Sequence, residues 1–253
     1  MTINSMASNS LSNDMLRLST AKRTNSAADD ATGLSISEAL KSTSNGLKTG
    51  IDNTENMGNL VNTAEGGLSG ASDMLHQMRD LAVQAGNGTL SREDRAAIQA
   101  EIEGLKGGIQ DALKNTQYNS MNLLDGSFTN QNTASNADGT GMEVNIRNTS
   151  LESLGIADFD VTSSFDLEKI DNAIENVSET RSSLGAISNA LSHVSNANNN
   201  AYVNQVSSLS RIQDADMAET IANMNKNKAL EQLSMFSVQK QNEQLKNRFS
   251  VMF

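Results

Sequence analysis

Two histidines are the side chains best suited to metal binding or proton transfer in this sequence. His76 and His193 are its only histidines, and both fall in segments with helical periodicity. A zinc or catalytic pair would require the two helices to align them beside further ligands. The chain has no cysteine, and neither histidine has a glutamate at a metal-ligand spacing. We therefore favour ordinary bundle or surface histidines, and we predict no metal, no cofactor and no catalytic residue.

Four aspartates are the second group that could do chemistry. Asp29 and Asp30 are adjacent, and Asp214 and Asp216 lie near the start of the last helical segment. Paired carboxylates can serve acid–base catalysis or hold a cation, but no nucleophile or pocket signature lies beside them. The favoured interpretation is that they cap helices and form local hydrogen bonds.

The segment from Ser127 to Thr149 is rich in serine, threonine and asparagine. It has two interpretations, an exposed loop or a carrier of O-linked glycans, and the sequence does not choose between them.

The composition favours helices. The 253 residues contain no proline, no tryptophan and only 3% aromatic residues. A core of leucine, isoleucine, alanine, methionine and valine suits helix-on-helix packing, and the absence of proline permits long uninterrupted helices. The formal net charge is −11 without any Lys/Arg block, which argues against nucleic-acid binding. Residues 1–20 lack the apolar region of a signal peptide, and no apolar run is long enough to cross a membrane.

Long stripes of small and apolar residues predict the central helices. From Val61 to Ala85 these residues recur at spacings of three and four, which is typical of a coiled-coil seam. Gly86–Gly88 ends that helix, and Ser91 is positioned to cap the next one. The stripe of the second helix comprises Ile98, Ile102, Leu105, Ile109 and Leu113. Another stripe runs from Leu167 to Ile212 and predicts one helix through the polar run 196–200.

Residues 120–165 interrupt the helical pattern. Met142, Val144 and Ile146 alternate with polar residues, which predicts a strand. The predicted fold is mainly α: a long antiparallel helical bundle or coiled coil with one small β-hairpin insert and terminal helical arms.

Both ends of the chain carry apolar stripes that need a partner surface. The N-terminal arm runs from Met1 to Leu40 and the C-terminal arm from Ser210 to Phe253. The obvious partners are each other and the same arms of neighbouring copies, which indicates a self-assembling filament subunit and not an enzyme. The predicted packing residues are Ile3, Leu11, Met15, Leu18, Met217, Ile221, Met224, Leu233, Leu245 and Phe249.

Several segments resemble bacterial flagellins. The run Ser26–Ser37, Ser-Ala-Ala-Asp-Asp-Ala-Thr-Gly-Leu-Ser-Ile-Ser, is similar to the N-terminal signature of that family. Later matching blocks are Thr63–Gly66 (Thr-Ala-Glu-Gly), Arg79–Ala85 (Arg-Asp-Leu-Ala-Val-Gln-Ala), Asn122–Gly126 (Asn-Leu-Leu-Asp-Gly) and Ser210–Ala218 (Ser-Arg-Ile-Gln-Asp-Ala-Asp-Met-Ala). They occur in the family's order and span nearly the whole chain.

The resemblance implies an organisation and a set of partners. Residues 1–42 with 212–253 would form the inner coiled-coil domain of the filament, and residues 43–211 the surrounding rod domain. The protein would polymerise with identical subunits for motility and lie outside the cell. Export would proceed without a cleaved signal peptide, through the flagellar secretion apparatus with an export chaperone. The cap and the hook-junction proteins would be further partners, with no nucleic acid and no membrane. Methionines on the apolar faces would give adaptable packing between copies, although a promiscuous Met-rich groove is the alternative.

The sequence departs from the family pattern in two places. The arm before Ala27 is roughly three helical turns shorter. The positions matching the family's contact with an animal Toll-like receptor are Gln77, Leu81 and Glu101, and Gln77 stands where recognised members carry arginine. Loss of that multidentate donor predicts weak recognition.

Two alternatives remain at this point. A hook-filament junction (hook-associated) protein would share both arms, although the complete Ser26–Ser37 block favours flagellin. A coiled-coil interaction module outside any filament is the alternative from another class.

Overall fold

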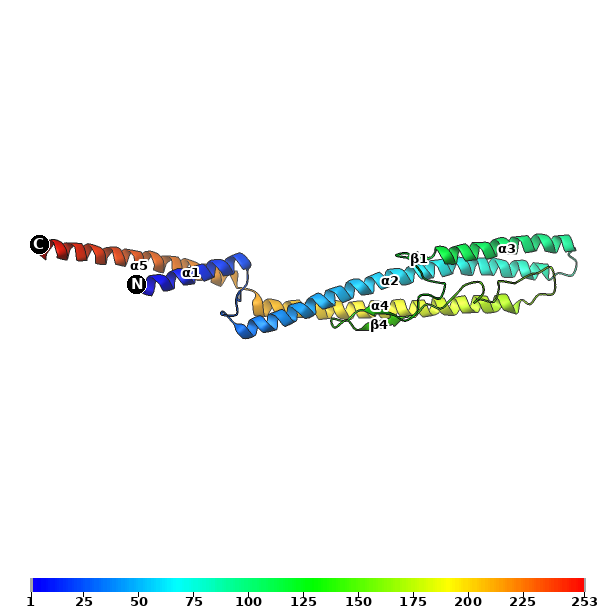
Figure 1. The fold of residues 1–253 in the computed structure, drawn as a ribbon, viewed down its shortest axis with the longest axis horizontal. Coiled ribbons are helices and arrows are strands. Elements are labelled where there is room, and N and C mark those ends of the chain that lie inside the picture. The colour runs from blue at the N-terminus through cyan, green and yellow to red at the C-terminus, as the bar shows by residue number, and fades with distance from the viewer. Residues whose placement is uncertain (1, 253) are drawn as a thin grey trace. The chain divides into compact units, whose positions relative to one another are not determined.

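The computed structural model describes the backbone of residues 2–252 and the side chains of residues 8–248. Its elements in chain order are α1 (Thr2–Thr20), α2 (Ala31–Ala85), α3 (Arg92–Asn115), β1 (Gln117–Tyr118), β2 (Met121–Asn122), β3 (Gln131–Ala134), β4 (Gly141–Val144), α4 (Glu168–Gln213) and α5 (Met217–Met252) (Figure 1). The prediction of a mainly helical fold is confirmed. Within the described residues, no helix is both long enough and apolar enough to cross a bilayer.

The chain divides into two compact units. One unit comprises residues 1–44 and 203–253, and the other comprises residues 45–202. We call the first the terminal unit and the second the central unit. Helices α2 and α4 each contribute residues to both.

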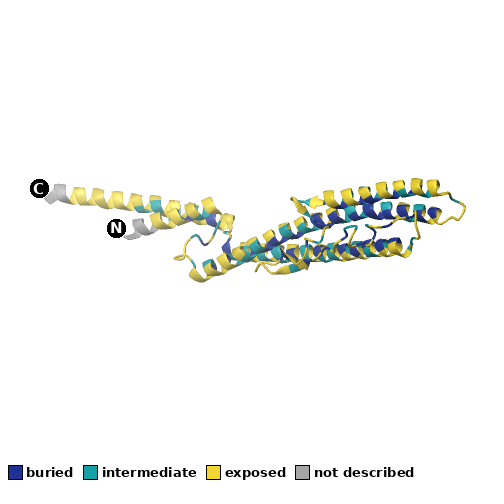
Figure 2. Cartoon of the chain, turned by 45° about the vertical axis from the view of Figure 1, so that its right-hand side comes forward, coloured by how far each residue is buried: buried dark blue, intermediate teal, exposed yellow. Residues whose placement is uncertain are grey.

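The core of the central unit is the predicted seam of α2. Seven of its small or apolar residues are fully buried: Ala64, Leu68, Ala71, Leu75, Met78, Ala82 and Ala85. They pack with buried residues of α3 and α4, including Ile102, Ile109, Ile170 and Val177 (Figure 2). Alanine at four of the seven positions lets the helix backbones approach closely. A long stripe with little side-chain volume can therefore still form a closely packed core.

Helix α3 starts where the sequence predicts. The Ser91 side chain accepts a hydrogen bond from the Asp94 backbone, and the Asp94 carboxylate accepts one from the Ser91 backbone, which completes a capping box. The hydrogen bond from the Ser91 backbone, followed by that from the Ser91 hydroxyl, lowers the pKa of Asp94. Helix α4 runs unbroken through residues 196–200, so the prediction of one passing helix is confirmed.

The segment between α3 and α4 corrects the prediction of a single hairpin. There are two antiparallel hairpins, β1–β2 and β3–β4, and the first begins before residue 120. The strands of the first hairpin have two residues each, too short to show alternation, and its turn uses Asn119 and Ser120 at positive φ without any glycine. Ile146, predicted within the strand, lies beyond the end of β4 but is buried in the core.

The β3–β4 hairpin is clamped between α2 and α4. Asn53 on α2 donates from Nδ2 to the Ala134 carbonyl oxygen at 2.9 Å, and Asn198 on α4 donates to the Ser135 carbonyl oxygen at 2.7 Å. Gly50 lets the hairpin approach, because a Cβ built there would lie 2.0 Å from the Ser135 oxygen. Two amides and one glycine therefore fix the hairpin against the helices.

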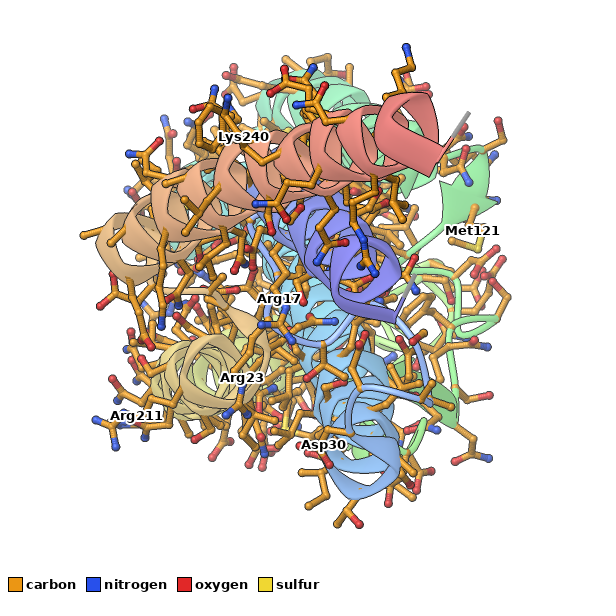
Figure 3. The ribbon with its side chains drawn as sticks, turned by 90° about the vertical axis from the view of Figure 1, so that its left-hand side faces the viewer. Arg17, Arg23, Asp30, Met121, Arg211 and Lys240 are labelled. Atoms are coloured by element: carbon orange, nitrogen blue, oxygen red, sulfur yellow. The ribbon has the colours of Figure 1, made fainter. Side chains whose placement is uncertain are left out.

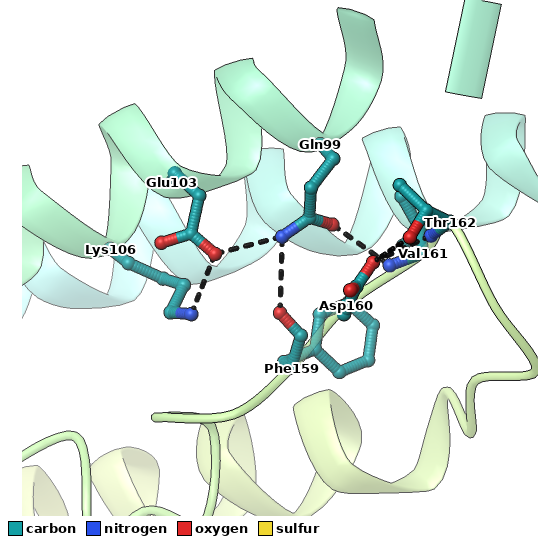
Figure 4. A network of polar contacts seen from close by, with 7 residues as sticks. All are labelled: Gln99, Glu103, Lys106, Phe159, Asp160, Val161 and Thr162. Carbon is teal, nitrogen blue, oxygen red and sulfur yellow. Dashed lines mark hydrogen bonds and ion pairs between the residues drawn. The ribbon is translucent and has the colours of Figure 1, made fainter. Parts of the chain in front are cut away.

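A polar network fixes the loop that precedes α4 (Figure 4). Gln99 on α3 accepts a hydrogen bond from the Val161 backbone at 2.8 Å and donates to the Phe159 carbonyl oxygen at 3.3 Å. Its Nε2 also donates to Glu103, which forms an ion pair with the mostly buried Lys106. The loop thus places Phe159 and Val161 in the core, where both are buried.

Candidate assembly surface on the paired terminal helices

Helices α1 and α5 run side by side in the terminal unit (Figure 1). Their shared seam is more polar than predicted. Asp14 and Thr220 are buried in it, and Asn227 donates to the Asp14 carboxylate at 2.6 Å. The half-buried residues of the two helices are Leu11, Arg17, Leu18, Met224, Asn227, Glu231 and Ser234. Side chains at 220, 224, 227, 231 and 234 alternate spacings of four and three, so this face of α5 has the coiled-coil period without an apolar composition.

Two short connectors interrupt the predicted N- and C-terminal arms. The predicted arm Met1–Leu40 is not one helix, because it breaks between α1 and α2, where Ala21 has a φ of 56°. The connector after α1 pairs with the one before α5 through a bridge between Lys22 and Asp214. Arg23 strengthens the pairing: its backbone N–H donates to the Gln213 oxygen at 2.7 Å and its guanidinium to the Ile212 oxygen at 2.8 Å (Figure 3).

The aspartates act as caps and local acceptors, as favoured. Asp30 accepts from the Gly33 backbone at 2.8 Å at the start of α2, and Asp216 accepts from the Ala218 backbone at 2.9 Å at the start of α5. Hydrogen bonds from the Asn25 and Ser26 backbones lower the pKa of Asp29. Both histidines are exposed on their helices. Among the described residues, no three His, Cys, Asp or Glu side chains are grouped to hold a metal ion.

The predicted packing residues fall into two groups. Leu11, Leu18 and Met224 are half-buried within the α1–α5 seam, whereas Met15, Met217, Ile221, Leu233 and Leu245 are exposed. The side chains of Ile3 and Phe249 lie outside the described residues. Five further exposed apolar side chains in these helices were not predicted: Leu16, Leu230, Met235, Phe236 and Val238. They belong to no single apolar stripe, which is the pattern on which the prediction rested.

Most of α5 is exposed (Figure 2), and its exposed apolar side chains point in several directions instead of forming a single face. Leu233 and Met235 are 64% and 49% exposed, and residues two apart project about 160° from each other around a helix. Phe236 projects in a third direction, with Lys240 5.9 Å from its ring centroid. Apolar side chains that point in several directions need covering surfaces on several sides. One partner helix, α1, cannot cover them all.

The three positions predicted to contact a receptor lie in the central unit. Gln77 on α2 and Glu101 on α3 are exposed, and Leu81 on α2 is half-buried against the core. Leu81 has a structural role besides any contact it makes with a partner.

Comparison with known proteins covers both ends of the chain. Residues 1–129 match the model of the bacterial flagellin N-terminal helical region, and residues 167–247 match that of the C-terminal helical region. Flagellin of Bacillus subtilis (strain 168) is 33% identical, over 97% of this chain and 94% of the relative. A flagellar filament core protein of Brachyspira hyodysenteriae is 33% identical, over 89% of this chain and 86% of the relative.

Solved structures agree on the fold. The crystal structure of Bacillus cereus flagellin has 27% sequence identity and a TM-score of 0.50, with 58% of this chain and 88% of that chain covered. A structure described as a flagellar hook-associated protein of Vibrio parahaemolyticus gives a TM-score of 0.59 over 74% of this chain and all of that one. Its 18% identity indicates a shared fold alone, so the hook-associated alternative has less support than the filament subunit. With both family regions matched and relatives a third identical over nearly their whole length, the chain belongs to the bacterial flagellin family and is a structural, non-enzymatic subunit of the flagellar filament.

Proposed function

We propose that α1 and α5 carry the contacts by which identical subunits polymerise. Residues 1–42 with 212–253 form the inner coiled-coil domain of the filament, and residues 43–211 form the rod domain around it. The observation that supports this assignment is the ring of exposed apolar side chains on α5, with Leu233, Met235 and Phe236 pointing in different directions. Covering such a helix removes apolar surface from water, which stabilises the polymer by roughly 25 cal/mol for each Å² of apolar area buried.

The polar seam supports the same assignment. Asp14, Thr220 and Asn227 face the partner helix of the same chain, whereas exposed apolar side chains such as Leu233 and Phe236 point in other directions. Contacts within one chain thus align the two helices, and contacts with other copies supply the apolar burial. Each copy would present the exposed apolar surface of α5 to different neighbours on different sides. Such contacts do not close into a ring, so an open helical polymer results.

Further partners follow from the family. We infer export without a cleaved signal peptide through the flagellar secretion apparatus, with an export chaperone, and contact with the cap and hook-junction proteins at the filament ends. We also infer that a Toll-like receptor binds this protein weakly, through Gln77, Leu81 and Glu101. Gln77 offers an amide where a guanidinium fork would give bidentate, charged hydrogen bonds.

Deletion of Met217–Phe253 tests the assembly assignment. We expect the truncated protein to form no filaments on addition of seeds, as measured by sedimentation and electron microscopy. Its central unit keeps its own buried core, so circular dichroism should still show a cooperatively melting helical protein. Filaments formed by the truncated protein would refute the assignment.

A further inference from the structure

Three methionines of the terminal helices are exposed. Met15, Met217 and Met235 are 54%, 40% and 49% exposed, whereas Met78 in the core of the central unit is fully buried. The chain contains twelve methionines and no cysteine. Any oxidant that reacts with sulfur therefore reacts with thioethers, and the exposed ones react first.

Two of these methionines share one side of α5. Met217 and Met235 are eighteen residues apart, which is about five turns of an α-helix, so both project in the same direction. Ile221 follows Met217 by four residues and is exposed beside it. This side of α5, which we call the methionine face (Met217, Ile221 and Met235), lies next to the seam occupied by α1.

We propose that Met15, Met217 and Met235 are sulfoxidation sites, and that their oxidation state sets whether the subunit can polymerise. The inference rests on the proposed assembly role of α1 and α5. In the reaction, a sulfur lone pair attacks one oxygen of hydrogen peroxide. The S–O bond forms as the O–O bond breaks, the proton on the attacked oxygen passes to the second oxygen, and the second oxygen leaves as water. The thioether loses two electrons and the peroxide gains them.

The product changes the chemistry of the face. A sulfoxide is a strong hydrogen-bond acceptor, and the neighbouring Ile221 side chain has no donor to offer it. Solvent satisfies this oxygen in the free subunit, because all three methionines are exposed there. Burial in an apolar contact would leave it unpaired, which disfavours polymerisation while the folded subunit is unaffected. A polymer formed beforehand should cover the same sulfurs and protect them.

Met121 provides a matched control. Its exposed fraction of 45% is similar to those of Met217 and Met235, but Met121 lies on β2 of the central unit. Peroxide should oxidise it as readily, and its sulfoxide should leave the terminal helices unchanged.

The test is a seeded polymerisation of monomers pretreated with hydrogen peroxide, with each sulfoxide quantified by peptide mass spectrometry. We expect the critical concentration of the unmodified sequence and of Met121→Leu to rise by about tenfold or more after oxidation. A variant carrying Met15→Leu, Met217→Leu and Met235→Leu should lose most of that rise. Methionine sulfoxide reductase should restore assembly of the oxidised, unmutated protein, a readout that needs no substitution.

Three results would overturn the inference: an unchanged critical concentration despite sulfoxide at all three sites, an equal rise in the triple variant, or no recovery after reduction of the sulfoxides. Ile221→Asp separates this inference from the assembly assignment, because it places a charge on the same face without involving sulfur. If Ile221→Asp blocks assembly and peroxide does not, only the oxidation inference fails. If Ile221→Asp assembles normally, the assembly surface itself is misassigned.

Discussion

Asp14 and Asn227 meet across the seam between the two ends of the chain, with 2.6 Å between the Asn227 amide nitrogen and an Asp14 carboxylate oxygen. Asp14 is buried there. A buried polar pair specifies alignment better than it adds stability, as single polar residues do in coiled coils. The α1–α5 pair is therefore suited to setting the register of the arms, and the exposed apolar residues of α5 remain available to other copies.

The clamp on the β3–β4 hairpin predicts opposite effects for two glycines of the same helix. Gly50→Ala should lower the free energy of unfolding by about 1–3 kcal/mol, because its Cβ would overlap the Ser135 carbonyl oxygen. Gly58→Ala is the control: no atom lies within 4 Å of the added carbon, and helix propensity should raise stability by about 1 kcal/mol. Urea unfolding of the two variants checks the pair, and equal effects would refute the clamp.

The capping box of α3 predicts a pH dependence of stability. Hydrogen bonds from Ser91 lower the pKa of Asp94 in the folded state below its unfolded value. The stabilisation is therefore present above the unfolded pKa and is lost as pH falls through the folded pKa. Asp94→Asn should lower the melting temperature near pH 7, and the difference from the unmutated protein should shrink below about pH 4. Asp52→Asn, at an exposed position on α2, is the control. A difference that stays constant with pH would contradict the role of the ionised carboxylate.

The proposed receptor contact at Gln77 yields a gain-of-function prediction. Gln77→Arg should raise signalling in a Toll-like receptor reporter assay, because a hot-spot arginine is typically worth about 2 kcal/mol, roughly thirtyfold in affinity. Leu81→Ala should lower any signal. Because Leu81 also packs against the core, the melting temperature of the Leu81→Ala variant must be measured to separate a lost contact from a loss of stability. No gain from Gln77→Arg would show that another surface sets the response.

The helices of the central unit were predictable, because their signal is local and strong. The stripe from Val61 to Ala85 has no missed position, and all its seam residues between Ala64 and Ala85 are fully buried. The cap at Ser91 was predictable for the same reason. The β1–β2 hairpin was not, because two-residue strands carry no period. The hairpin clamp depends on Asn53 and Asn198, which nothing near them in the sequence singles out.

The terminal unit was predicted only in part, and the reason is physical. Apolar periodicity identifies the face that a helix buries, but α5 turns a largely polar face toward α1, with Thr220 and Asn227 in the seam. The stripe through Met217 and Ile221 lies beside that face and is exposed. Periodicity alone therefore does not distinguish a face that packs within the chain from one that we propose to pack against another copy.

The critical concentration for polymerisation of Ile221→Asp, compared with the melting temperature of its monomer, tests the central claim most directly. Ile221 is 43% exposed in the subunit, so the carboxylate remains solvated there, but polymerisation would bury it without a partner. Val83→Asp, at a 50% exposed position on α2 in the central unit, is the matched control. We predict that Ile221→Asp raises the critical concentration by about thirtyfold or more with little change in melting temperature, and that Val83→Asp raises it far less. An unchanged critical concentration for Ile221→Asp, or the same rise for both variants, would contradict the assignment of α5 as the assembly surface.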